Sequence, residues 1–166
     1  MDDLVVVLES EKNEYDKLIG LSENLKDAVI EHAIEKVEAA TDAQEAVTNN
    51  IVVLENRRKK ILNDIALVLN KKADEITISD LLETLKDQPE VKDRLSNARN
   101  SLKETMESLR RRNDANQSLL KTAMELLDFD LNLYRSMRQA PSTANYNKSA
   151  ENTGSLLGRG GFDAKQ

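Results

Sequence analysis

The chain has 166 residues, of which 33% are charged, 39% are hydrophobic and 3% are aromatic. Five glycines and two prolines are too few for the many turns of a β-sandwich, a barrel or a doubly wound sheet, so the composition predicts an all-α fold. With no cysteine and a single histidine, thiol catalysis and the common metal sites are disfavoured. We expect neither a metal nor a cofactor.

The distribution of charge and apolar residues narrows the possible partners. The net charge is −6, and residues 1–45 carry 13 acidic against 4 basic side chains. Nucleic acid is not an expected partner, because binding to phosphates depends on their neutralisation by Lys and Arg. The apolar run at residues 4–8, which no other run exceeds, is far shorter than the about 20 residues that span a bilayer, and no basic segment precedes it as in a secretory signal. We expect a cytoplasmic protein without membrane insertion.

Two series of apolar residues at helical spacing predict the first two helices. Both series alternate steps of three and four residues, which places their members on one helix face. The first comprises Leu4, Leu8, Glu11, Tyr15, Leu18, Ser22, Leu25 and Val29, and the second comprises Val37, Ala40, Gln44, Val47, Ile51, Leu54, Arg58, Ile61, Ile65 and Val68. The second series is out of phase with the first, which predicts a break between Glu31 and Glu35. The second helix should end at about Asn70.

A short helix and a long helix are expected next. Thr77 is a suitable N-cap with Asp80 in the first turn, which predicts a short helix near residues 79–87. Pro89 then suits the first position of a helix that has no further Pro or Gly until Pro141, a length of about 50 residues. Its predicted stripe is Val91, Leu95, Ala98, Leu102, Met106, Leu109, Asn113, Asn116, Leu120, Ala123, Leu127, Tyr134 and Met137. The expected architecture is an antiparallel bundle of three long helices with one short helix.

The composition changes after Gln139, because the last part of the chain holds four of the five glycines and few apolar residues. We therefore predict a helical bundle domain over residues 1–140 and a flexible, disordered tail over residues 141–166. Spaced apolar residues in such a tail can order against the grooves of a partner. The predicted docking contacts are Tyr146, Leu156, Leu157 and Phe162.

The charged and amide residues indicate structural roles rather than catalysis. The carboxylates are scattered over helix surfaces, and no acid, base and nucleophile converge, so an enzyme is not expected. Two basic runs, residues 57–60 and 110–112, point around the helix circumference, and pairing with the acidic first helix is favoured over binding of partners or nucleic acid. His32 is expected at the surface or in a helix cap. Asn113 and Asn116 are interpreted as a polar layer that fixes helix register.

The end of the long helix is apolar on more than one face, which is wider than a single packing stripe needs. Such a helix end is either wrapped by other helices or open to a partner helix. Because the first two helices are too short to cover all of it, we predict a partner-binding surface here. Its expected members are Leu119, Leu120, Leu127, Phe129, Tyr134 and Met137.

Four segments follow one another along the chain: Leu8-Glu9-Ser10-Glu11 followed by Tyr15 and Leu18, Leu54-Glu55-Asn56-Arg57-Arg58, Thr77-Ile78-Ser79-Asp80-Leu81, and Arg112-Asn113-Asp114-Ala115-Asn116-Gln117-Ser118-Leu119-Leu120. In this order and at these distances, they resemble the FlgN family of flagellar export chaperones. The resemblance implies a cytoplasmic, non-enzymatic chaperone that holds hook-filament junction (hook-associated) proteins and hands them to the flagellar export gate. It also implies that a mobile tail helps delivery. The alternative is a structural coiled-coil or adaptor protein that binds partner helices, and the oligomeric state is left open.

Overall fold

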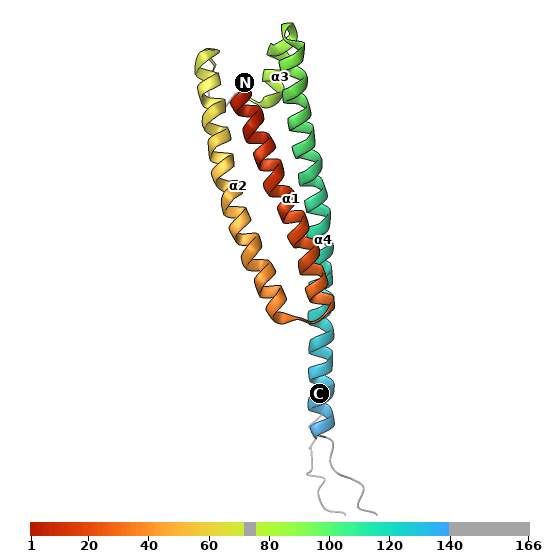
Figure 1. Cartoon of the computed structure of the whole chain (residues 1–166). Helices are drawn as coiled ribbons and strands as arrows, with labels where there is room; N and C mark the ends of the chain where they lie inside the picture. Colours follow the sequence, from red (N-terminus) through yellow and green to blue (C-terminus); the bar gives the residue numbers. More distant parts are fainter. Residues whose placement is uncertain (72–75, 140–166) are drawn as a thin grey trace, which may run out of the picture. The chain divides into compact units, whose positions relative to one another are not determined.

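A computed structural model describes residues 1–71 and 76–139, and the regular structure in these residues is helical (Figure 1). The elements are α1 (Asp2–Ile30), α2 (Ile34–Val68), α3 (Ile78–Thr84), the 3₁₀ turn η2 (Leu85–Asp87) and α4 (Pro89–Gln139). The predicted all-α fold of three long helices and one short helix is confirmed. Residues Met1–Asp128 form a first compact unit, and a second unit begins at Phe129, within α4.

Within the first unit, α1 lies beside both α2 and α4 (Figure 1). The chain reverses between α1 and α2, so these two helices are antiparallel. Arg94 is paired with Asp2 and Asn116 with Ser22, so α4 runs in the same direction as α1. The three long helices therefore follow an up-down-up course, with α3 and η2 between the second and the third.

The helices α1 and α2 end with the same backbone motif. After α1, the His32 N–H donates to the Val29 carbonyl (3.2 Å) and the Ala33 N–H donates to the Ala28 carbonyl (3.0 Å). His32 has a φ of 55°, and Asn70, which ends α2 in the same way, has a φ of 53°. This is a Schellman motif, which usually has glycine at the left-handed position. The break falls within the predicted interval, and His32 is an exposed capping residue as expected.

The start of α3 is fixed by the predicted cap. The Asp80 N–H donates to the Thr77 hydroxyl (3.2 Å), and the Thr77 N–H donates to the Asp80 carboxylate (2.8 Å), which makes a reciprocal capping box. Hydrogen bonds from the Thr77 hydroxyl and N–H stabilise the charged form and lower the pKa of Asp80. Pro89 begins α4, also as predicted.

The core lies where the start of α1, the end of α2, α3 and the first turns of α4 meet. Its buried members are Leu4, Val5, Leu8, Ala66, Ile76, Leu81, Leu85, Leu95, Ala98 and Leu102. All eight members of the predicted α1 stripe are buried or half-buried. Apolar burial is the main favourable contribution to folding, so this end of the unit anchors the three long helices.

Six members of the predicted stripes are exposed: Val68 on α2, and Met106, Asn113, Leu127, Tyr134 and Met137 on α4. Val68 is 85% exposed. Glu11 pairs with Arg58 in the antiparallel hairpin, so the first residue of α1 lies opposite about residue 67 of α2. The final turn of α2 is therefore not covered by α1. In α4, Thr105 is buried and Met106 is exposed, because the buried series steps by three residues after Leu102 rather than by four. The prediction placed Met106 in the stripe because methionine is more apolar than the neighbouring Thr105.

An acid lies inside the apolar stripe of α1. Glu11 is 1% exposed, and its Oε1 lies 3.1 Å from Nε of Arg58 on α2. Burial raises the pKa of Glu11, and the Arg58 charge lowers it by a smaller amount, so the net shift is upward. A buried acid within an apolar interface is thus matched by a cation from the neighbouring helix.

Candidate partner-binding site

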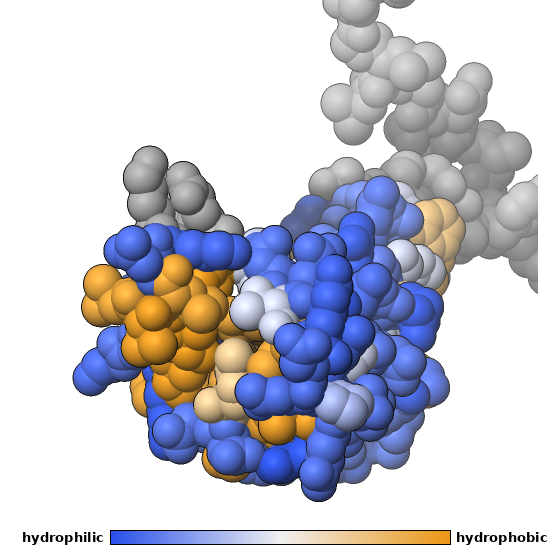
Figure 2. Space-filling view, turned by 90° about the horizontal axis from the view of Figure 1, so that it is seen from above, coloured by the Kyte–Doolittle hydropathy of each residue, from blue (hydrophilic) through white to orange (hydrophobic). Residues whose placement is uncertain are grey.

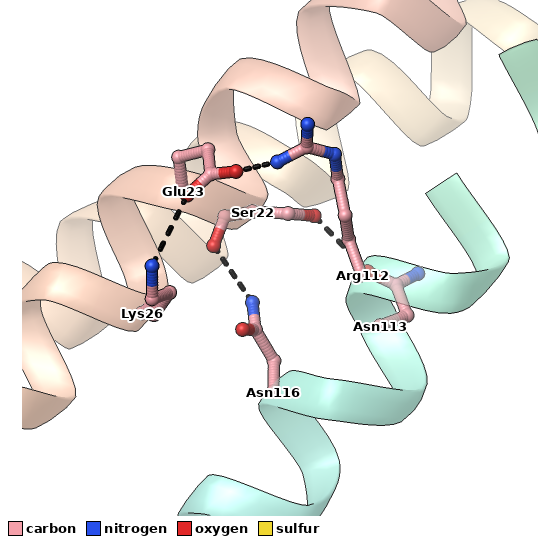
Figure 3. A network of polar contacts seen from close by, with 6 residues as sticks. All are labelled: Ser22, Glu23, Lys26, Arg112, Asn113 and Asn116. Atoms are coloured by element: carbon pink, nitrogen blue, oxygen red, sulfur yellow. Dashed lines mark hydrogen bonds and ion pairs between the residues drawn. The ribbon is translucent and has the colours of Figure 1, made fainter. Parts of the chain in front are cut away.

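A polar layer between α1 and α4 precedes the apolar end of α4 (Figure 3). The Asn116 side chain is buried, and its Nδ2 donates to the Ser22 carbonyl (2.7 Å). The Ser22 hydroxyl donates in turn to Oδ1 of Asn113 (3.0 Å), although Asn113 itself is exposed. A slide of either helix by one turn would separate these partners and leave buried polar atoms unpaired, which is costly. The predicted register-fixing role of the two asparagines is therefore supported by specific contacts.

Ion pairs surround this layer. Arg112 pairs with Glu23 on α1, and Glu23 lies 3.7 Å from Lys26 (Figure 3). Together with the Arg58–Glu11 pair, this shows that each of the two basic runs contributes one cation to the acidic first helix. The interpretation of these runs as intramolecular partners of α1 is confirmed for Arg58 and Arg112.

Cover by α1 ends soon after this layer. Ser22 faces Asn116, and α1 ends at Ile30, eight residues further on, so the parallel helices place its last residue opposite about residue 124 of α4. Burial follows this geometry within the first unit. Leu119 and Leu120 are half-buried, whereas Leu127 is 56% exposed. The end of the first helix thus sets the point at which the apolar side chains of α4 become accessible.

The remaining predicted anchors lie on the part of α4 that belongs to the second unit. Phe129, Tyr134 and Met137 are 63%, 59% and 69% exposed. Further large apolar side chains of this helix are also exposed, and they were absent from the predicted site: Met124, Leu126, Leu131 and Leu133. The high density of apolar residues in this part of the sequence, on which the predicted site was based, could also have indicated these four residues. Arg138 lies over the Tyr134 ring, 5.6 Å from its centre, in a cation–π contact.

An apolar helix with this pattern is suited to one kind of contact. Exposed apolar area that becomes buried against a partner contributes about 25 cal/mol per Å², and helical spacing favours a partner helix that inserts side chains at matching intervals. The site therefore offers non-covalent capture of an amphipathic segment. The six predicted anchors lie on one helix, α4. The predicted tail contacts Tyr146, Leu156, Leu157 and Phe162 lie outside the described residues.

A second apolar surface appears at the opposite end of the first unit, where α1 begins and α2 ends (Figure 2). The exposed large apolar residues in the last turn of α2 are Leu67, Val68 and Leu69. The sequence did not indicate this surface, because the periodicity assigned Val68 to the buried stripe. Local periodicity cannot reveal that the neighbouring helix starts too late to cover this turn.

The surface depressions of the first unit do not bring a catalytic set together. One of them, of about 390 Å³, lies near the α1–α2 turn and is lined by Leu21, Asn24, Asp27, Ala28, Glu31, Lys36, Ala39 and Ala40. In residues 1–71 and 76–139, no cluster of three or more acidic or histidine side chains is placed to hold a metal ion. None of the helices in the described part of the chain combines the length and apolarity of a bilayer-spanning segment.

These features define a helical-bundle protein with an accessible apolar helix end, and comparison with known families identifies the family. The family model described as FlgN protein matches residues 1–154. The chain therefore belongs to the FlgN family, a family of flagellar export chaperones. No curated protein and no solved structure matches the chain significantly.

Proposed function

We propose that this chaperone works in the cytoplasm, binds hook-filament junction proteins through the apolar C-terminal part of α4 and delivers them to the flagellar export apparatus. The observation that carries the proposal is the exposure of Leu127, Phe129, Tyr134 and Met137 on a helix whose Leu95, Leu102 and Leu109 are buried. Family membership supports a role in flagellar export. The proposed activity is binding alone, without catalysis and without a cofactor.

The geometry supports capture of a helical or unfolded cargo segment. Large apolar side chains in water are unfavourable, and a cargo segment that covers them would remove that cost on both partners. Leu119 and Leu120, which are half-buried at the border of the covered part, would extend this contact towards the bundle. A few central apolar and aromatic anchors usually contribute most of the binding free energy in such contacts.

Co-expression with the junction proteins of the same organism, followed by pull-down and size-exclusion chromatography, tests the proposal. Leu127→Asp and Tyr134→Ala should weaken binding by about 1 to 4 kcal/mol without loss of helical content. Val53→Asp is a matched control, since Val53 is an exposed apolar residue on α2. Equal cargo affinity for wild type and both α4 variants would exclude this site, and capture of other partner helices without junction proteins would favour an adaptor.

We further propose that the tail, residues 141–166, docks on the export gate through Tyr146, Leu156, Leu157 and Phe162. Support comes from the sequence, in which these apolar residues are spaced through a polar, glycine-rich segment. Deletion after Gln139 should preserve helicity and cargo capture but reduce cargo secretion. Unfolding of the shortened protein would make the tail part of the core, and normal secretion would reduce it to a spacer.

A further inference from the structure

One charged residue lies in the middle of the apolar surface at the end of α4. Asp130 is exposed and belongs to the second unit. Residues three, four and seven apart share a face of a helix. Around Asp130 these positions are occupied by Ala123, Leu126, Leu127, Leu133, Tyr134 and Met137. The carboxylate is therefore surrounded along the helix by apolar and aromatic side chains.

No cation of its own helix is placed to neutralise this carboxylate. Neighbours at helical spacing include no Lys or Arg: Arg135, five residues on, lies on another face of the helix, and Arg138, eight residues on, lies over the Tyr134 ring. In the described part of the chain, the ion pairs of α4 involve other acids, such as Glu23 with Arg112 and Glu125 with Lys121. Any apolar partner that covered this surface would bury a charge without compensation, which is strongly unfavourable.

The first unit shows how the same chain resolves an equivalent problem. Glu11 lies within the apolar stripe of α1, and the neighbouring helix supplies Arg58, with 3.1 Å between Oε1 and Nε. The cation comes from the packing partner rather than from α1 itself. By the same electrostatic requirement, a segment that packs over Asp130 must bring its own cation.

We infer that the cargo segment bound by α4 is a cationic amphipathic helix that places one Lys or Arg, flanked by apolar residues, opposite Asp130. The inference rests on the proposed function and specifies the chemistry of the partner. Apolar anchors supply most of the affinity, while the ion pair sets the register of the cargo helix. It also discriminates against wholly apolar or acidic helices, which leave Asp130 unpaired or repelled.

Isothermal titration with synthetic peptides that span the helical segments of the junction proteins tests the inference on the full chain. Asp130→Asn should weaken binding by about tenfold or more, because it removes one partner of a desolvated charge pair. Asp128→Asn is the matched control: this acid is exposed two residues earlier, and helical spacing puts it beside Glu125 and Asn132 as well as Met124 and Leu131, with the cations Lys121 and Arg135 seven residues away on the same face. The control should change affinity less than about twofold, as for a solvent-screened charge.

A second measurement leaves the chaperone unchanged. Each Lys and Arg of the peptide is replaced in turn by Gln, and one replacement should weaken binding to the wild type as much as Asp130→Asn does. That replacement should have little further effect on the Asn variant, because the two changes remove the same pair. Replacing the same peptide residue by Glu should restore binding to Asp130→Lys.

The outcomes separate this inference from the proposed function. If the wild type binds none of the peptides and none of the intact junction proteins, the proposed function fails and the inference fails with it. If the wild type binds but Asp130→Asn and Asp128→Asn bind equally well, the inference is overturned while the proposed function stands. Tighter binding by Asp130→Asn would also overturn it, because the carboxylate would then only oppose burial.

Discussion

The two parts of α4 carry similar apolar periodicity and have different surroundings. In residues 89–116, the buried positions follow helical spacing against α1, and the core begins with Leu95. In residues 119–138, apolar side chains recur at the same spacing and with greater density, but Leu127 and those beyond it are exposed. Periodicity therefore predicts which residues share a helix face, whereas the length of α1 determines which of them it buries in the first unit.

The polar layer of Ser22 and Asn116 lies between these two parts. On the core side of this layer, the helices are held by apolar packing. Apolar packing is non-directional, so it distinguishes only weakly between registers that differ by one helical turn. The amide and carbonyl contacts are directional and permit one register only. Register thereby fixes where α1 ends along α4, and so where the accessible apolar surface starts.

The largest expected effect is on the stability of the buried part. Leu95 is fully buried, so Leu95→Ala should lower the free energy of unfolding by about 2 to 5 kcal/mol through lost burial and a cavity. Urea unfolding followed by circular dichroism measures this change. Leu127→Ala, the same substitution in the exposed part, should change stability by less than about 0.5 kcal/mol. A comparable loss for both would show that the two parts do not differ in burial.

A smaller effect is expected at the polar layer. Asn116→Ala removes the hydrogen bond to the Ser22 carbonyl, and the free energy of unfolding should fall by about 1 to 3 kcal/mol. Gln117→Ala, at an exposed neighbouring position, is the control and should be nearly neutral. An unchanged urea midpoint for Asn116→Ala would mean that the layer contributes nothing to holding α4 on α1.

The smallest expected effect concerns pH and the acid in the α1 stripe. Because the folded-state pKa of Glu11 is raised, mainly by burial, its contribution to stability is present below the ordinary pKa of 4.5 and is lost as pH rises through the folded-state pKa. The stability of the wild type relative to Glu11→Gln should therefore decrease from acidic to neutral pH. Urea unfolding across this range measures the trend, with Glu9→Gln as the exposed-site control. An increase with pH would mean that Arg58 outweighs burial.

Most of the fold could be predicted because its signals are local. Thr77 and Asp80 form the cap of α3, Pro89 begins α4, and the phase slip after Val29 marks a real reversal of the chain. The end of α1 was harder to place, since His32 takes the left-handed position that glycine usually occupies. Without a glycine at this position, the sequence gives no signal for the end of the helix.

The sequence by itself determined the helices, the cap of α3, the acidic first helix with its basic partners, and the motifs shared with the FlgN family. Only the tertiary structure decided that Thr105 rather than Met106 is buried, that Val68 is exposed and that Arg58 is the partner of Glu11. The physical reason is the range of the interactions. Helix formation and capping depend on residues within about four positions, whereas burial and ion pairing depend on which distant helix lies alongside and where it ends.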